Sequence, residues 1–384
     1  MEFDLTWLLL GLPLAFILGW AASRFDLRQL RAENRSAPKA YFKGLNYLLN
    51  EQQDQAIDAF IEAVQNDPDT SELHFALGNL FRRRGEYDRA VRVHEHLLSR
   101  GDLSRSDRER AQHALALDFL KAGLLDRAED ALQRLEGTPF EAQARLALLA
   151  IYERSRDWAQ ASAIAEKMHA ADQGDYSGRL AHYLCEQAQA LLSQGQHDAA
   201  ARLLDEAIEA APQAARPRID RARLYQIQGQ PAQALQALDD LCKHAPNALP
   251  LATGLLLDVA RQTGRTNTAR QWLEAHYERT ASLDVLEALV QLDAMDGGNG
   301  PGRERYVTHL ARERSLVAAT RWLAGERLER EALHPPVQQA LEHASKPLTR
   351  YRCAACGFEA RQHFWQCPGC QSWDSYPARR VEEL

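Results

Sequence analysis

Four cysteines near the end of the sequence are the residues best suited by type and spacing to do chemistry. They form two CxxC pairs separated by ten residues, Cys353 with Cys356 and Cys367 with Cys370. Each pair can fold into a tight knuckle whose backbone N–H groups point at sulfur, and two facing knuckles offer four tetrahedral thiolates. The spacing therefore predicts one tetrahedral four-thiolate metal ion, iron or zinc, since both suit such a site. Four protein ligands leave no position for water, which favours a structural role over a hydrolytic one.

The segment 346–384 forms the predicted metal module around these cysteines. Its aromatic residues are candidates for a small core: Tyr351, Phe358, Trp365 and Trp373. A module of this size buries too little apolar surface to fold alone, so we expect the metal to contribute folding free energy. Lys346 and Pro347 make a short link to the preceding residues, and we therefore expect the module to dock on them.

No other residues form a recognisable catalytic group. The sequence has no Walker loop, dinucleotide fingerprint, nucleophile elbow or HExxH motif. None of its 13 histidines pairs with a cysteine or carboxylate at a catalytic spacing. The two remaining cysteines, Cys185 and Cys242, lie among apolar residues, where buried free thiols are ordinary. We expect a protein that is not an enzyme.

The elements that must position the cysteines belong to a repeat array. An alanine recurs at spacings of 34, 38, 33, 39, 34 and 35 residues, at Ala56, Ala90, Ala128, Ala161, Ala200, Ala234 and Ala269. A glycine stands five residues before it at Gly85, Gly123, Gly195, Gly229 and Gly264, and Arg156 takes this place in one repeat. This is the pattern of tetratricopeptide repeats, in which glycine allows the left-handed turn between two helices. We expect such repeats over 37–280, and irregular helical repeats and a linker over 281–345.

Stacked helical hairpins form a concave groove whose usual occupant is a peptide or another protein. Arg83 and His94 are candidates for exposed contacts in this groove, although an ordinary solvated side chain is the simpler interpretation of each. An array that serves only as a spacer is the alternative to a binding array.

The first residues predict a membrane anchor. Residues 5–23 contain no charge, and as a helix they rise about 28 Å, close to the roughly 30 Å of a hydrocarbon core. We expect a transmembrane helix over 1–23 and a basic juxtamembrane segment over 24–36. Because the basic residues follow the apolar run, the rest of the chain is expected in the cytoplasm. A cleaved signal peptide and a buried core helix are the alternatives.

Composition limits the class of protein. The 384 residues contain 46 Lys+Arg and 53 Asp+Glu, a formal net charge of −7, which argues against a general nucleic-acid coat. Hydrophobic residues make up 45% and charged residues 26%, as in an ordinary globular protein. The chain is rich in helix formers, so we expect an all-α fold.

These parts together resemble the lipopolysaccharide assembly protein B family. The resemblance is carried by the start of the array at 41–49, by LGNLFRRRGE at 77–86, and by YRCAACGF at 351–358 with WQCPGC at 365–370. It implies a tetratricopeptide-repeat solenoid with an N-terminal transmembrane helix and a small C-terminal rubredoxin-like metal-binding module. Gln371 stands where standard rubredoxins place glycine.

The resemblance also implies a function. Proteins similar to this chain act at the inner membrane of Gram-negative bacteria, as single-pass adaptors with their bulk on the cytoplasmic side. They help a membrane-anchored ATP-dependent protease to degrade the deacetylase that commits precursors to lipid A, and so restrain lipopolysaccharide synthesis. They are also linked to a lipopolysaccharide-sensing inner-membrane protein. From the net charge of −7 we expect no nucleic-acid partner, and homo-oligomer formation remains open.

Two other classes of function remain as alternatives. An iron-loaded module could act as a rubredoxin-type electron carrier, which visible colour and reversible reduction would reveal. A zinc ribbon could instead bind nucleic acid through Arg350, Arg352 and Arg361, and salt-sensitive retention of nucleic acid would then be expected.

Overall fold

The computed structural model describes residue 16 and residues 39–66, 70–295, 299–326 and 334–384. Apart from Phe16, the predicted transmembrane helix and the whole predicted basic segment lie outside the described residues. Within the part that is described, no helix combines the length and the apolar character needed to cross a bilayer.

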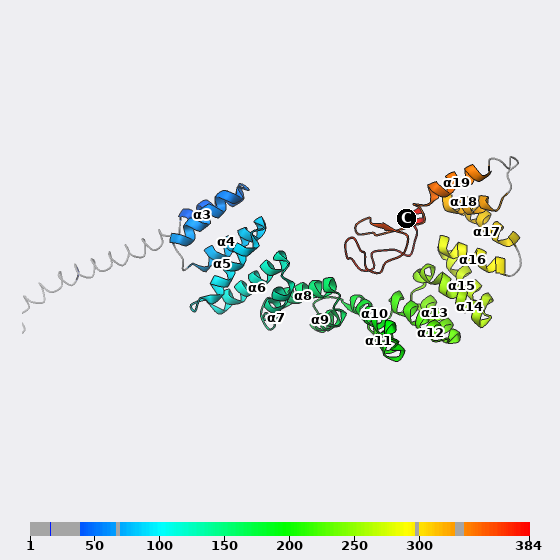
Figure 1. Ribbon diagram of the computed structural model, residues 1–384, viewed down its shortest axis with the longest axis horizontal. Helices are drawn as coiled ribbons and strands as arrows, with labels where there is room; N and C mark the ends of the chain where they lie inside the picture. The colour runs from blue at the N-terminus through cyan, green and yellow to red at the C-terminus, as the bar shows by residue number, and fades with distance from the viewer. Residues whose placement is uncertain (1–15, 17–38, 67–69, 296–298, 327–333) are drawn as a thin grey trace, which may run out of the picture. The chain divides into compact units, whose positions relative to one another are not determined.

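The chain divides into two compact units, Met1–Ile151 and Tyr152–Leu384. In the first unit, successive helices from α2 to α7 pack against one another (Figure 1), and α8 crosses into the second unit. Their bounds are α2 Lys39–Leu49, α3 Gln53–Asn66, α4 Ser71–Arg84, α5 Tyr87–Ser99, α6 Arg105–Ala122, α7 Leu125–Gln133 and α8 Glu141–Ser155.

The second unit continues the helices and ends in the cysteine module. Its helices are α9 Trp158–Ala170, α10 Ser177–Ser193, α11 His197–Ala210, α12 Ala215–Ile227, α13 Pro231–His244, α14 Thr253–Thr263, α15 Thr266–Arg279, α16 Leu283–Met295, α17 Asn299–Arg312, α18 Leu316–Ala324 and α19 His334–Ser345. A 3-10 helix, η1 Pro246–Ala252, precedes α14, and another, η3 Val381–Glu383, lies near the chain end. The short strands β1 Tyr351–Arg352 and β2 Glu359–Ala360 pair antiparallel.

The turn chemistry predicted from the repeats is confirmed. The five turn glycines have φ between 65° and 85°, the left-handed region in which a side chain is costly. Arg156, which takes the glycine position in one repeat, also has a positive φ of 59°. The seven recurring alanines are all 0% exposed, because they lie where the two helices of a hairpin meet.

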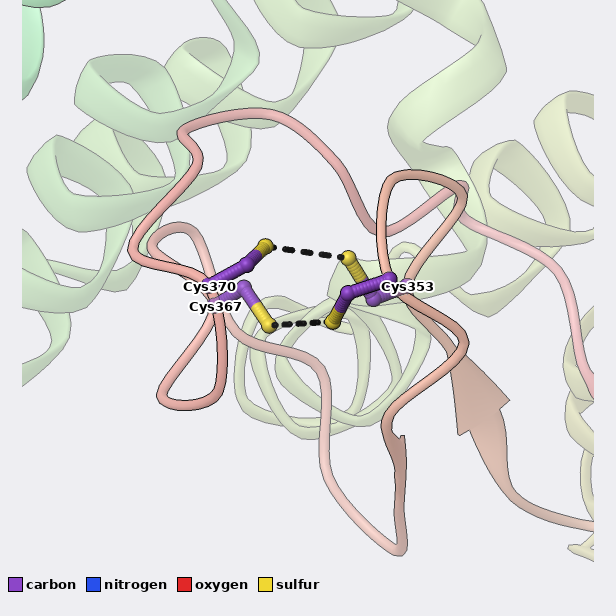
Figure 2. A group of neighbouring side chains, drawn as sticks. Cys353, Cys367 and Cys370 are labelled. Atoms are coloured by element: carbon purple, nitrogen blue, oxygen red, sulfur yellow. Dashed lines mark hydrogen bonds between the residues drawn. The ribbon is translucent and has the colours of Figure 1, made fainter. Parts of the chain in front are cut away.

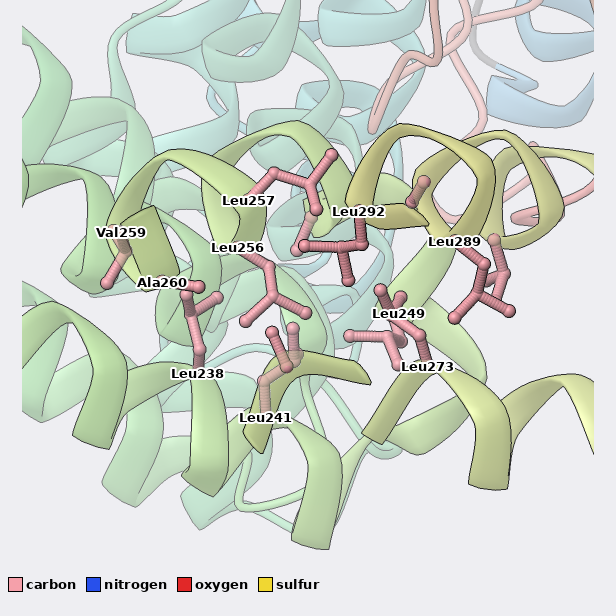
Figure 3. Close-up of a cluster of buried hydrophobic side chains, with 14 of the residues drawn as sticks. Leu238, Leu241, Leu249, Leu256, Leu257, Val259, Ala260, Leu273, Leu289 and Leu292 are labelled. Carbon is pink, nitrogen blue, oxygen red and sulfur yellow. The ribbon is translucent and has the colours of Figure 1, made fainter. Parts of the chain in front are cut away.

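Apolar contacts hold each unit together. In the second unit the largest cluster joins helices α12 to α18, and Figure 3 shows its leucines converging from successive helices. Leu238, Leu256 and Leu292 in this cluster are each fully buried. Burying a leucine side chain contributes about 1.5–3 kcal/mol, so packing between hairpins stabilises the array.

The prediction that His94 is an exposed groove residue is wrong. His94 is 0% exposed, and its Nδ1 lies 2.5 Å from Asp118 Oδ2. Arg82 donates to the other oxygen of that buried carboxylate at 2.8 Å. A Cβ at Gly78 would come within 2.5 Å of the His94 ring, so glycine is what lets the two helices approach. Arg83 is exposed, as expected.

A second sequence pattern occurs twice between helices α15 and α18. Residues 276–283 read HYERTASL and residues 309–316 read HLARERSL, so the pattern HxxRxxSL recurs after 33 residues. The two segments are the α15–α16 and α17–α18 turns. In both turns the serine N–H donates to the carbonyl two residues before it, at 2.8 Å and 3.1 Å. The helical pairs here share a turn of their own that lacks the glycine signal.

Candidate metal centre

A β-hairpin forms the first knuckle. Strands β1 and β2 pair Tyr351 with Ala360 and Arg352 with Glu359, which brings the chain back on itself at Cys353. The N–H of Cys353 donates to the Phe358 carbonyl at 2.9 Å, and the N–H of Gly357 donates to the Cys353 carbonyl at 2.9 Å. Gly357 has a φ of 78°, so the turn after the second cysteine of this pair needs the left-handed conformation.

The second knuckle repeats this geometry without glycine. The N–H of Gln371 donates to the Cys367 carbonyl at 2.8 Å, and the N–H of Cys367 donates to the Ser372 carbonyl at 2.9 Å. Gln371 occupies the position equivalent to Gly357, one residue after the second cysteine, and has a φ of 60°. A non-glycine residue in this region costs roughly 1–2 kcal/mol. The substitution noticed in the sequence is therefore accommodated by strained backbone rather than by a different turn.

The four cysteine sulfurs converge between the two knuckles (Figure 2). Cys353 Sγ lies 3.8 Å from Cys370 Sγ, and Cys356 Sγ lies 3.7 Å from Cys367 Sγ. All four sulfurs lie within 4.8 Å of one another. Metal–sulfur bonds of about 2.3 Å in a tetrahedron place sulfurs about 3.8 Å apart. These two distances thus fit a four-thiolate ion.

Polar groups around two of the sulfurs, those of Cys353 and Cys370, favour thiolates. Burial opposes the charge of Cys353, but the Ser375 hydroxyl and the N–H groups of Ala355 and Cys356 outweigh it and lower its pKa to about 6. The Ser372 hydroxyl lies 3.3 Å from Cys370 Sγ and lowers the pKa of that thiol. Donors directed at sulfur are what a metal-binding knuckle requires.

The core of the module differs in part from the prediction. Tyr351 is buried as expected, and it is joined by Tyr376, which the sequence reading did not single out. Phe358 is 45% exposed, and its ring lies over Gly369 of the other knuckle. Trp373 is used to dock the module instead of filling its centre. Phe358 and Trp373 are thus corrections to the predicted core.

Trp373 holds one side of the module on the array. Its indole N–H donates to Glu153 Oε1 at 2.9 Å, and its ring stacks on His182 with centroids 4.7 Å apart. His182 Nε2 lies 2.8 Å from Asp374 Oδ2. Tyr183 also donates to Glu153, at 2.5 Å, and burial together with this carboxylate raises the pKa of Tyr183. The predicted docking of the module on the helices is confirmed.

Asp284, at the start of α16, holds the other side. Arg380 forms a bidentate ion pair with it, with Nη2 2.6 Å from Oδ1 and Nε 3.0 Å from Oδ2. The Tyr351 hydroxyl donates to Oδ2 at 3.1 Å, and the Arg380 guanidinium lies 4.1 Å from the Tyr351 ring centre. Burial opposes the charge of Arg380, but Asp284 outweighs it and raises the pKa. Burial and Asp284 also raise the pKa of Tyr351.

Two consecutive glutamates of the tail cap two helices of the array. Glu382 accepts from the N–H groups of Leu316 and Val317, at 2.5 Å and 3.1 Å to the same oxygen. Glu383 accepts from the N–H of Leu283 at 2.5 Å. Leu316 and Leu283 are the first residues of α18 and α16, where backbone N–H groups lack partners and the helix dipole favours an anion. Sequence reading missed both contacts, although the HxxRxxSL repeat marks the two helix starts.

Other residues raised by the sequence take no part in this site. Cys185 is buried and Cys242 is half-buried; burial raises the pKa of Cys185 and raises that of Cys242 to about 11. Both therefore fit the expected unreactive thiols. Arg350 and Arg352, two of the three arginines of the nucleic-acid alternative, lie 3.7 Å and 2.8 Å from Glu359 carboxylate oxygens.

Comparisons with known proteins match both parts of the molecule. Residues 351–376 match a family model described as a rubredoxin metal binding domain, and residues 73–109 and 191–259 match models described as a tetratricopeptide repeat. These matches and the geometry confirm a mostly helical repeat array with a C-terminal four-cysteine module.

Relatives match over nearly the whole chain. Lipopolysaccharide assembly protein B of Escherichia coli (strain K12) is 30% identical over 390 residues, which cover 98% of this chain and 99% of that protein. The protein of the same name from Haemophilus influenzae is 27% identical over 391 residues, 96% of each. Among solved structures, a tetratricopeptide repeat protein from Parabacteroides merdae has a TM-score of 0.33 and 16% identity, covering 66% of this chain and 97% of that one.

Proposed function

The chain belongs to the lipopolysaccharide assembly protein B family, and we propose that it is an inner-membrane adaptor that regulates lipopolysaccharide biosynthesis. It brings the deacetylase that commits precursors to lipid A to a membrane-anchored ATP-dependent protease, which degrades it. The adaptor transforms no substrate itself. A lipopolysaccharide-sensing inner-membrane protein contacts it through the segment predicted to span the membrane. The observation that carries this proposal is the 30% identity over 98% of the chain.

In this proposal Cys353, Cys356, Cys367 and Cys370 bind one metal ion, iron or zinc. The sulfur spacing and the donors around Cys353 support the assignment. A bound ion crosslinks the two knuckles and so contributes folding free energy to the module. Metal analysis of the purified protein distinguishes the two ions, and a red iron–thiolate colour that bleaches on reduction would favour the electron-carrier alternative.

The adaptor role rests on confinement at the membrane and on the repeat array. A single membrane helix would hold the repeats in a layer next to the bilayer, where it raises the effective concentration of partners in the same membrane. Repeat arrays bind other proteins along their concave surfaces. In the second unit, Glu153, His182 and Asp284 are already engaged by the module. The protein partners accordingly bind surfaces that the module leaves open, or the module itself.

A pull-down from membranes tests the proposal. The full-length chain is expected to retain both the protease and the deacetylase, and a variant without residues 1–23 is expected to lose most of the protease. Cys353→Ser should impair regulation of the deacetylase, whereas Cys242→Ser, which changes a thiol outside the module, should not. Recovery of neither enzyme from membranes that contain both would contradict the adaptor role.

A further inference from the structure

A cavity of about 350 Å³ lies where the tail of the module meets the array. Three segments line it: the α15–α16 turn, the α17–α18 turn and the tail at 379–383. Its volume falls within the roughly 300–1,000 Å³ of small-molecule sites. The two turns are the HxxRxxSL segments, so the cavity is built from two copies of one turn and closed by the tail.

Three arginines line this cavity. Arg279, Arg314 and Arg379 come one from each lining segment, and all three are exposed. Among the described residues, none of the three has a carboxylate within ion-pair distance, whereas their neighbours Arg312 and Arg380 are both paired. Guanidinium groups that line a cavity and form no ion pair of their own are suited to bind an anion.

Three carboxylates also line the cavity and equal the three guanidinium groups in formal charge, but two of them already have other partners. The carboxylates of Glu382 and Glu383 are held by the N–H groups of α18 and α16, and they face the helix N-termini. Glu313 is the remaining acid of the lining, and it is exposed.

A buried histidine adds a donor. His309 is 2% exposed and lines the cavity. The Tyr277 hydroxyl lies 2.6 Å from His309 Nδ1; when it donates to that nitrogen, the neutral ring carries its proton on Nε2. In that tautomer the N–H at Nε2 has no protein acceptor among the described residues and is available to a ligand oxygen.

We propose that this cavity binds a phosphate group, as a phosphomonoester or pyrophosphate. Three guanidinium groups and an imidazole N–H match a compact group with several charged oxygens better than a single carboxylate. The ligand would touch both turns and the tail at once. Because it binds the docked form only, it would stabilise the contact between the module and the array. A free phosphorylated molecule and a phospholipid headgroup share this chemistry.

Calorimetric titration of the full-length, detergent-solubilised protein with pyrophosphate tests the proposal. The double variant Arg314→Gln/Arg379→Gln should weaken binding by about tenfold or more, because charge-assisted hydrogen bonds are lost. Arg265→Gln is the matched control, since Arg265 is exposed and lies outside the cavity. Glu313→Gln should tighten binding. Tryptophan fluorescence confirms that each variant keeps the module docked.

Two further arms identify the ligand class. Short-chain phosphatidic acid, compared with short-chain phosphatidylcholine, tests a lipid source; binding of the former supports the proposal with a headgroup as the ligand. Citrate tests the phosphate preference, and binding as tight as that of pyrophosphate would overturn it. No binding of either phosphate probe, or binding unchanged in the double arginine variant, would also overturn the proposal.

Discussion

Helices α6 and α18 start in the same way but are held by very different parts of the chain. At α6, Ser104 accepts from the N–H of Asp107 at 3.0 Å, three residues away. At α18, Ser315 accepts from the N–H of Ala318 at 2.9 Å, and Glu382 is added from the far end of the module. Helix α6 is therefore capped by a residue next to it in the sequence, whereas α18 also receives a cap from the tail of the cysteine module.

Helix α16 also receives its cap from the tail of the cysteine module. Its preceding residue, Ser282, is buried, and its hydroxyl has no partner among the described residues. The N–H of Leu283 is held instead by Glu383, 100 residues later. A cap from so far away exists only while the module is folded and docked. Under the metal assignment proposed above, metal binding is therefore energetically coupled, through docking of the module, to the ends of two array helices.

The largest expected effect tests that coupling directly. Cys353→Ser removes one of the four predicted metal ligands, and we expect the module to lose its fold because it buries too little surface to fold without metal. Backbone hydrogen exchange should then rise sharply at Leu283 and Leu316, and remain unchanged at Asp107 in the first unit. Exchange at Leu283 and Leu316 that stays slow without the metal would show that the array does not depend on the module.

The next effect isolates the tail contact. Glu382→Gln keeps the size of the side chain but removes the charge that faces the start of α18, and we expect it to destabilise the second unit by about 1–2 kcal/mol. Ser104→Ala is the matched change in the first unit and should cost about 1 kcal/mol there. Urea unfolding of the two variants measures both losses. If Glu382→Gln were silent, the backbone contacts of Glu382 would not be a cap in solution.

The contrast also explains what the sequence could predict. The turn glycines, the buried alanines and the four cysteines were found because each depends on residues within one repeat or one knuckle. The tail caps join residues about 65 and 100 positions apart, and no local spacing signals such a pair. The repeated HxxRxxSL segment was a usable signal, but it does not match the repeat consensus.

The predicted positions of His94 and Trp373 are wrong for the same reason, because the partners of both residues are distant in the sequence. The sequence predicts His94 as an exposed helix residue because nothing within its own helix indicates a buried partner. Its partner Asp118 lies on the next helix, 24 residues away, and this contact is what allows a polar ring to be buried. Trp373 looked like a core residue because its docking surface, Glu153 and His182, is separated from it by about 200 residues of the array.

Protonation of Glu383 sharpens the comparison further. Burial raises its pKa above the ordinary 4.5, so the folded state binds the proton more tightly than the unfolded state. The stability that Glu383 contributes is fully present when the pH is below the ordinary pKa, and it is lost as the pH rises through the pKa of the folded state. We expect Glu383→Gln to reduce the decline of unfolding free energy over that range. Ser104→Ala, at the locally capped helix, should leave the pH dependence unchanged, and an identical slope in wild type and Glu383→Gln would contradict this role.

The smallest expected effect compares the two knuckles. Gly357 and Gln371 hold equivalent positions with φ of 78° and 60°, so only the second knuckle bears the cost of a side chain in the left-handed region. Gln371→Gly should stabilise the module by about 0.5–1 kcal/mol, a net of relieved strain and greater freedom of the unfolded chain. Gly357→Ala, which introduces the same strain in the first knuckle, should destabilise it by a similar amount. The rate at which a chelator removes the metal measures both changes. Because Glu383 caps α16 only while the module is folded, the Gln371→Gly variant should also slow backbone hydrogen exchange at Leu283. A faster metal loss in Gln371→Gly would mean that the Gln371 side chain stabilises the second knuckle by more than its backbone conformation costs.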